Sequence, residues 1–251
     1  MKGLGMDLDK KQTEIYSRQI MMKEIGSKGQ HKLAKASVLV VGCGGLGAPV
    51  LYYLTAMGIG HLGLCDNDSV SLSNLNRQIL FTADDLFKPK ASTAKDRLKS
   101  LNPELITTVY EQPMDEKLAE DIVPVYDVVV DCLDNFETRF ILNDACIKAK
   151  KPLVHAGIGE FYGQLMTITP GKGPCLRCLF PNGIKDNELK KQFGVISPTP
   201  GVMGAMQAME VAKLLLGLQV NNDGLITYDG LDLSTEKVPL QASPDCICRG
   251  R

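Results

Sequence analysis

A glycine-rich stretch offers the clearest chemistry in the sequence. Residues 37–48 form an apolar run that enters a turn with the pattern Gly42-x-Gly44-Gly45-x-Gly47. In such a turn the first glycine permits a tight bend, the second lets backbone N–H groups approach a phosphate, and the last lets a helix pack closely on the strand. The apolar run that follows is compatible with a helix whose N-terminus faces the anion. The stretch therefore predicts a nucleotide site, although a tight strand-to-helix connection without a ligand would need the same glycines.

An acidic residue and a polar loop follow the next apolar run. Residues 62–65 lead into Asp66, at the position where an acid can bind ribose hydroxyls. The stretch 66–78 is polar and rich in turn formers, which predicts an ordered loop over the strand ends, where open α/β sheets bind ligands. These features indicate a nucleotide without saying which one.

Three further charged residues suit a triphosphate. Arg77 lies in the polar loop and Lys90 in the first turn of a predicted helix, so both are placed to reach phosphates. Asp134 follows the buried strand predicted over 127–131, and Mg²⁺ prefers one or two carboxylates plus substrate phosphates. Each residue also has a simpler interpretation, as a surface charge for the two cations and as a helix cap for Asp134. Together with Asp66 they form a constellation that a redox dinucleotide site would not need.

Four of the eight cysteines form two close pairs, Cys175-x-x-Cys178 and Cys246-x-Cys248. The first pair is a standard zinc half-site, and two separated pairs in a reduced protein more often hold a structural zinc ion than do redox work. We expect such a metal to clip the tail back onto the strand near Thr167. The shorter second pair leaves a free redox pair, or thiols without metal, as alternatives.

The composition is that of an ordinary globular chain. A chain of 251 residues with 44% hydrophobic content can bury a full core. A net charge of −1 and a pI near 6.3 give no reason to expect nucleic acid or an anionic membrane as a partner. We expect no signal peptide and no membrane span, because the most apolar stretch, 201–218, is interrupted by Glu210 and Lys213. Cysteines inside apolar runs fit reduced thiols and a cytoplasmic location.

The order of the predicted elements indicates the fold. Residues 1–36 suit one or two amphipathic helices. Strand-like and helix-like segments alternate over 37–157, which predicts a mostly parallel, doubly wound, Rossmann-like sheet that forms the nucleotide-binding core. Residues 158–251 are expected to add antiparallel strands, a deeply buried helix, the zinc site and a mobile crossover loop at about 181–200. We therefore expect a single α/β domain over 1–251.

In combination, these motifs resemble those of the ThiF/MoeB/HesA family of E1-like adenylyltransferases, which activate ubiquitin-like sulfur carriers. The resemblance covers nearly the whole chain, and its motifs are highly specific together, although the glycine pattern alone is weak. The matching segments are 16–20, 42–47, 66–68, 74–78, 89–91, 131–135 and 174–178.

The resemblance implies ATP as the bound nucleotide and gives roles to individual residues. Asp66 would contact the ribose, and Asp134 would hold magnesium. Arg18 would be supplied by the neighbouring subunit of a homodimer, as a charge-stabilising arginine. The residues that it places around the phosphates are Asn74, Arg77, Gln78 and Lys90.

The implied reaction is attack by the carrier's C-terminal glycine carboxylate on the α-phosphate of ATP. The products are an acyl-adenylate and pyrophosphate, ahead of thiocarboxylate formation. A carboxylate is already ionised, so the enzyme needs in-line positioning and neutralised phosphate charge and not a strong base. The implied partners are a small carrier ending in Gly-Gly and a separate sulfurtransferase or persulfide donor. The pathway stays open between molybdopterin, thiamin and other sulfur routes.

The sequence departs from the family in three places. Many relatives carry a cysteine in the crossover loop, but residues 187–194 contain none, so we expect no covalent enzyme–carrier adduct. Lys190 and Lys191 in that segment are expected to attract an acidic carrier surface. Phe87 stands where relatives often have glycine, and the last cysteine pair is one residue shorter. Both of these departures are expected to change local geometry only.

Three other functions remain open. An NAD-dependent oxidoreductase would share the glycine turn but leave Arg77, Lys90 and Asp134 unexplained. An E1-like tRNA-adenosine dehydratase would share the fold, although the pI offers no broad basic face for tRNA. A nucleotide-binding scaffold without turnover is the third. The three histidines are isolated in the sequence and receive no role: His31, His61 and His155.

Overall fold

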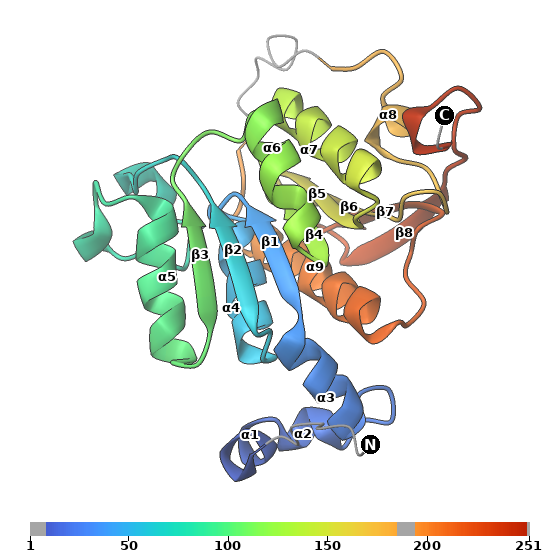
Figure 1. Ribbon diagram of the computed structural model, residues 1–251. Helices are drawn as coiled ribbons and strands as arrows, with labels where there is room; N and C mark the ends of the chain where they lie inside the picture. The colour runs from blue at the N-terminus through green and yellow to red at the C-terminus, as the bar shows by residue number, and fades with distance from the viewer. Residues whose placement is uncertain (1–8, 185–193, 250–251) are drawn as a thin grey trace.

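A computed structural model describes residues 9–184 and 194–249, and its centre is one eight-stranded sheet (Figure 1). The strands are β1 (Ser37–Val41), β2 (His61–Cys65), β3 (Ile106–Tyr110), β4 (Val128–Asp131), β5 (Leu153–Gly159), β6 (Tyr162–Ile168), β7 (Gly224–Asp229) and β8 (Ser234–Pro239). Their order across the sheet is β3-β2-β1-β4-β5-β6-β7-β8. The first five strands pair in parallel, and β6, β7 and β8 add antiparallel pairs. The predicted α/β fold, with a mostly parallel sheet and an antiparallel extension, is confirmed.

Helices cover both faces of this sheet. They are α1 (Lys10–Ile15), α2 (Ser17–Ile20), α3 (Gly26–Lys35), α4 (Gly47–Ala56), α5 (Lys90–Leu101), α6 (Glu116–Ile122), α7 (Phe136–Ala149), α8 (Leu176–Leu179) and α9 (Pro198–Leu216). Buried residues of α4, α5 and α9 share one hydrophobic cluster, and those of α6 and α7 share another. The sheet is therefore doubly wound, as the alternation of strand and helix patterns predicted.

The two clusters explain why the central strands are apolar along their whole length. Successive side chains of a strand point to opposite faces, so Val38 and Val40 of β1 enter one cluster while Leu39 and Val41 enter the other. A strand covered by helices on both faces has no polar side, which is typical of parallel sheets.

The C-terminal half of the chain extends the same sheet. The expected boundary after residue 157 falls inside β5, which pairs with β6 along its whole length, so the two parts share one sheet. The outer edge is β8, and all of its residues are exposed. No helix in the described ranges is long and apolar enough to cross a bilayer.

The expected crossover loop is described only in part. Residues 185–193, with Lys190 and Lys191, lie outside the described residues. Val195 forms a bridge with Glu160, and residues 198–200 already belong to α9. The end of the expected loop therefore leads straight into the buried helix.

The N-terminal helices lie at the amino ends of the parallel strands, at the bottom of Figure 1. Two glutamine side chains fasten them to the body of the protein. Gln19 of α2 and Gln30 of α3 both donate from Nε2 to the carbonyl oxygen of Met57, at 3.1 and 2.9 Å. Met57 is the C-cap of α4, so α2 is held at the C-terminal end of that helix.

Candidate functional site

The edge where β1 and β4 end is the natural ligand site of this fold. From β1 the chain continues to β2 on one side, and later returns to place β4 on the other, so the strand order reverses between β1 and β4. In open α/β sheets, ligands bind outside the carboxyl ends of the strands at such a switch point. The glycine turn leaves β1 at this edge, and the segment 132–135 leaves β4 there.

The glycines of the turn divide into two kinds. Gly42 has a φ of +96°, and a Cβ there would lie 2.5 Å from the carbonyl oxygen of Cys132. A Cβ on Gly47 would collide with the carbonyl oxygen of Gly42. These two glycines are required by the turn and by the close approach of α4. A Cβ on Gly44 or Gly45 would meet only side chains, at 3.3 Å or more. The middle of the turn is therefore free of tight backbone packing and faces neighbouring side chains.

Asp66 lies directly beside the turn. Its Oδ2 accepts the backbone N–H of Cys43 at 2.8 Å, and its Oδ1 accepts that of Asp68 at 2.8 Å. Burial raises the pKa of Asp66, although these two hydrogen bonds and the nearby ammonium of Lys90 oppose the rise. The carboxylate thus ties the end of β2 to the glycine turn after β1.

Lys90 is buried at the start of α5 and already has an anionic partner. Its Nζ lies 2.8 Å from Oδ2 of Asp68, and 7% of its side chain is exposed, against 64% for Asp68. An ammonium has three donors, of which Asp68 occupies one. Lys90 is therefore held in place by one carboxylate and keeps donors for a second anion.

The polar loop holds three of the predicted phosphate residues, and two of them, Arg77 and Gln78, pack against the turn. Asn74 uses its Oδ1 to accept the N–H of Ser71, which closes a short 3₁₀ turn. Arg77 donates to backbone and side-chain oxygens of the same loop, and its Cγ lies 3.7 Å from the Cβ position of Gly45. The Nε2 of Gln78 lies 3.3 Å from the Cβ position of Gly44.

The amide of Gln78 is the strongest sign of a ligand here. The residue is 5% exposed, and its Oε1 has no hydrogen-bond partner within the described part of the chain. Buried polar atoms are nearly always paired in folded proteins. A buried amide whose Nε2 faces a glycine turn and whose Oε1 lacks a partner therefore fits a bound polar ligand.

Asp134 is exposed, and the neighbouring Asn135 caps the helix that Asp134 was considered to cap. The N-cap of α7 is Asn135, whose Oδ1 accepts the N–H of Thr138 at 2.9 Å. The interpretation of Asp134 as a helix cap is therefore wrong. Its carboxylate projects from the segment after β4, two residues past Cys132, whose carbonyl packs on Gly42.

Arg18 is the predicted site residue that the structure does not bring to this edge. It is exposed on α2, next to Gln19, which binds the C-cap of α4. The glycine turn is at the other end of α4. The ten residues of α4 span about 15 Å at 1.5 Å per residue. Arg18 therefore lies at the opposite end of α4 from the nucleotide edge of its own chain.

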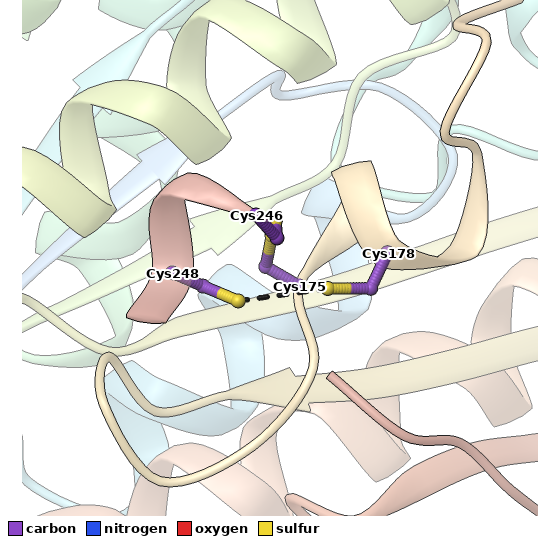
Figure 2. A group of neighbouring side chains, drawn as sticks. All are labelled: Cys175, Cys178, Cys246 and Cys248. Atoms are coloured by element: carbon purple, nitrogen blue, oxygen red, sulfur yellow. Dashed lines mark hydrogen bonds between the residues drawn. The ribbon is translucent and has the colours of Figure 1, made fainter. Parts of the chain in front are cut away.

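The four paired cysteines converge, as Figure 2 shows. Their Sγ atoms all lie within 4.8 Å of one another, with Cys175 and Cys246 at 3.5 Å and Cys178 and Cys248 at 3.5 Å. A tetrahedral ion with Zn–S bonds of about 2.3 Å needs sulfur atoms about 3.8 Å apart. The donor set and its spacing therefore fit zinc, and the Cys-x-Cys pair closes the set despite its shorter spacing.

The tail lies near Thr167, on the face of the sheet covered by α6 and α7. Thr167 donates to Glu210 of α9 at 2.6 Å, on the side of α4 and α9. The next residue, Ile168, faces the other side and packs in one cluster with α7 and the cysteines. The tail therefore meets β6 near Thr167, as expected, on the face of the strand to which Ile168 points.

A buried charged network behind Asp134 received no role from the sequence. His155 donates from Nδ1 to Oδ2 of Asp131 at 2.6 Å, and both side chains are fully buried. They face each other because β4 and β5 pair in a register that sets Asp131 opposite His155. That register is a property of the sheet, so no spacing in the sequence signals the pair.

Comparison with known proteins now gives the class of this one. The chain belongs to the ThiF family, which matches residues 16–249. It is 43% identical over 249 residues to the SAMP-activating enzyme E1 of Haloferax volcanii, covering 98% of this chain and 92% of that protein. It is 41% identical over 237 residues to the sulfur carrier protein ThiS adenylyltransferase of Escherichia coli, covering 94% of each.

A solved structure extends the comparison to a nucleotide complex. The crystal structure of Escherichia coli MccB with ATP superposes with a TM-score of 0.81 and is 27% identical in sequence. The match covers 92% of this chain and 73% of that one.

Proposed function

We propose that this chain is an ATP-dependent adenylyltransferase, a nucleotidyltransferase that activates the C-terminal glycine carboxylate of a small ubiquitin-like sulfur carrier protein. The products are the carrier's acyl-adenylate and pyrophosphate. Relatives named for this activity align with almost the whole chain, and the ATP complex of MccB supports ATP as the nucleotide.

The observation that carries the proposal is the convergence of five groups on one edge of the sheet. The turn at Gly44 faces the Nε2 of Gln78, whose Oε1 is buried without a partner. Asp66 binds the same turn, Lys90 lies beside Asp66, and Asp134 leaves the neighbouring strand. A hydride-transfer site has no need for a buried cation and a second carboxylate at this edge.

ATP would lie across the turn with its phosphates at Gly44 and Gly45. Asp66 would accept from the ribose, while Asn74, Arg77, Gln78 and Lys90 would donate to phosphate oxygens. The attacking carboxylate is already charged, so these donors act by reducing repulsion and holding the α-phosphate in line.

Magnesium is the natural counter-ion for this site. Asp134 would hold it, since its carboxylate is exposed and is not used as a helix cap. A bound Mg²⁺ would neutralise charge on the phosphates, and one protein carboxylate is enough for such a site.

The site is completed by a second copy of the chain. Arg18 lies at the wrong end of α4 to reach its own nucleotide, so we propose that it serves the neighbouring subunit of a homodimer. Apolar side chains that flank it on the N-terminal arm are exposed, with Met21 at 75% and Ile15 at 59%. Such residues are typical of a surface that a partner covers.

The cysteine cluster is proposed as a structural zinc site within a single adenylation domain over 1–251. Four thiolates leave no open position on the ion, which suits a structural and not a catalytic role. The metal would fix the tail against α7. The substrate carrier, a protein ending in Gly-Gly, would bring its C-terminus to the nucleotide site.

Exchange of labelled pyrophosphate into ATP tests the function. With a panel of small carriers ending in Gly-Gly, we expect exchange that requires both Mg²⁺ and one of the carriers. A carrier that lacks its last glycine is the control. Exchange with none of them, together with reduction or oxidation of NAD, would support an oxidoreductase. Binding of ATP without exchange would support a scaffold, and tRNA-dependent turnover would support a dehydratase.

A further inference from the structure

The charged network behind Asp134 contains a third member, Arg139 of α7. Its Nε lies 3.7 Å from Oδ2 of Asp131, and its side chain is 7% exposed. Burial disfavours the ionised form of Asp131, but Arg139 and His155 outweigh burial and lower its pKa. A carboxylate and a guanidinium are thus buried side by side under the segment 132–135.

The network holds both backbone groups of Leu133, the residue before Asp134. Asp131 accepts the Leu133 N–H through Oδ1 at 3.0 Å. Arg139 donates from Nη2 to the Leu133 carbonyl oxygen, and also to the carbonyl oxygen of Ala156 on β5 at 3.2 Å. Leu133 is therefore tied to two neighbouring strands and one helix by side chains that cannot move far.

The residue after Asp134 is fixed as well. Asn135 caps α7 through its side chain and accepts the N–H of Arg139 through its carbonyl oxygen at 3.4 Å. Further back, Gln207 of α9 donates to the carbonyl oxygen of Asp131 at 2.8 Å. The backbone is held on both sides of Asp134, whose own side chain is exposed.

Stability alone does not account for this arrangement. Replacing a buried ion pair by well-packed apolar residues is often neutral or stabilising. In metal sites, by contrast, the groups that orient a ligand matter almost as much as the ligand.

We propose that Arg139 and Asp131 are positioning residues, which clamp Leu133 so that the Asp134 carboxylate is presented to the metal–nucleotide complex before it binds. This inference rests on the proposed function of Asp134. Arg139 acts through the backbone and does not touch the substrate.

The test replaces Arg139 by lysine, which keeps a cation. A single ammonium cannot do what two nitrogens of Arg139 do, since Nε faces Asp131 while Nη2 donates to both carbonyl oxygens. Mn²⁺, an EPR-visible substitute for Mg²⁺, is titrated in the presence of ATP. We expect Arg139→Lys to weaken Mn²⁺ binding by about tenfold. Binding of ATP in the presence of EDTA should stay unchanged, and amide hydrogen exchange within 131–136 should become faster.

Arg97→Lys is the matched control. Arg97 lies 2.8 Å from the buried carboxylate of Asp85, so the same change is made in a similar pair that does not touch the segment after β4. Its Mn²⁺ affinity should equal that of the wild type. Adding Arg139→Lys to Asp134→Asn should weaken Mn²⁺ binding no further, because both changes act on one ligand.

The outcomes separate the clamp from the magnesium assignment. Asp134→Asn with full Mn²⁺ affinity would overturn the role of Asp134 itself. A folded Arg139→Lys variant with full affinity, beside a weakened Asp134→Asn, would overturn only the clamp. If Arg139→Lys unfolds, amide hydrogen exchange in the wild-type protein without ligand decides. The clamp requires the Leu133 amide to be protected from exchange before any ligand is added.

Discussion

Asp134 and Asn135 divide two tasks between neighbouring side chains. The amide of Asn135 satisfies a backbone N–H at the start of α7, and this leaves the carboxylate of Asp134 exposed at the end of β4. A helix N-terminus prefers a short side chain that accepts hydrogen bonds, and asparagine provides this as well as aspartate does. The charge of Asp134 is therefore not used to cap α7 and is available for chemistry.

Asp134→Asn should keep the fold and lose adenylate formation. The substitution preserves size and polarity but removes the charge from the proposed Mg²⁺ ligand, so we expect pyrophosphate exchange to fall by about 10²-fold or more. Pyrophosphate exchange kinetics measure the loss of activity, and thermal melting tests whether the fold is kept. Asp121→Asn, on the exposed side of α6, is the control. Near-normal exchange in a folded Asp134→Asn variant would refute the assignment.

Phe87 illustrates a residue under local strain. Its φ of 67° lies in the left-handed region, and the side chain is 85% exposed, so packing does not repay the cost. The left-handed conformation costs a non-glycine residue about 1–2 kcal/mol. This explains geometrically why glycine suits the position.

Phe87→Gly should therefore stabilise the protein. Relief of strain outweighs the greater flexibility of glycine in the unfolded chain, which costs about 0.5–1 kcal/mol, so we expect a gain of up to about 1 kcal/mol in the free energy of unfolding. Urea denaturation measures it. Phe87→Ala keeps the strain and should gain nothing; equal gains in both variants would mean that the aromatic ring, and not φ, is unfavourable.

At the scale of elements, the β1–turn–α4 unit combines a rigid frame with an open centre. Gly42 and Gly47 are packed against backbone atoms, whereas Gly44 and Gly45 are not. Glycine is therefore required for folding at the two ends of the turn, whereas in the middle of the turn it contacts only side chains.

Two alanine substitutions should separate these roles. Gly47→Ala forces a methyl group against the Gly42 carbonyl, so we expect a loss of about 3 kcal/mol in the free energy of unfolding. Gly45→Ala adds a methyl group 3.5 Å from Pro200, an ordinary contact. It should leave stability nearly unchanged and weaken ATP binding by about tenfold, because the methyl group would crowd the proposed phosphate site beside Arg77. Calorimetric titration gives the ATP affinity, and denaturation curves give the free energy of unfolding. If Gly45→Ala lost stability but kept its ATP affinity, the turn would be excluded as the phosphate cradle.

The β1–turn–α4 unit also shows which features can be predicted from the sequence and which cannot. Strands, turns and helices follow from local patterns of apolar residues and glycines. The sheet, its helices and the edge where the candidate site lies could therefore be predicted. The Asp131–His155 pair was not, because it depends on strand register. The pairing of Lys90 with Asp68 depends on how a loop folds over a helix start, which no local pattern encodes.

For the whole molecule, the position of Arg18 predicts complementation between subunits. Arg18→Ala and Asp134→Asn homodimers should both be inactive, but each mixed dimer assembles one intact site. Random exchange makes half of the dimers mixed, so activity should recover to about a quarter of the wild-type level. Exchange activity after subunit mixing is the measurement, and Lys23→Ala, on the same arm, should be active alone. No recovery despite proven mixed dimers would place Arg18 outside the partner's site.

Zinc should hold the two ends of the C-terminal part together. We expect about one zinc ion per chain by elemental analysis, and chelation should lower the melting temperature by roughly 10 °C, because binding of a closed structural ion contributes directly to folding. Cys246→Ser should have the same effect without chelator. A metal-free protein that melts at the wild-type temperature would rule out the structural role.

The exposed strand β8 has a consequence for how the protein behaves when concentrated. A sheet of eight strands still ends in an edge, and an edge strand offers unpaired backbone groups on which other chains can aggregate. The side chains of β8 work against this, since Pro239 has no N–H to offer, Glu236 and Lys237 are charged, and Lys237 is drawn into an ion pair with Asp223 at 2.7 Å. Growth of the sheet into edge-to-edge fibrils is therefore disfavoured at its β8 edge by the chemistry of the strand itself.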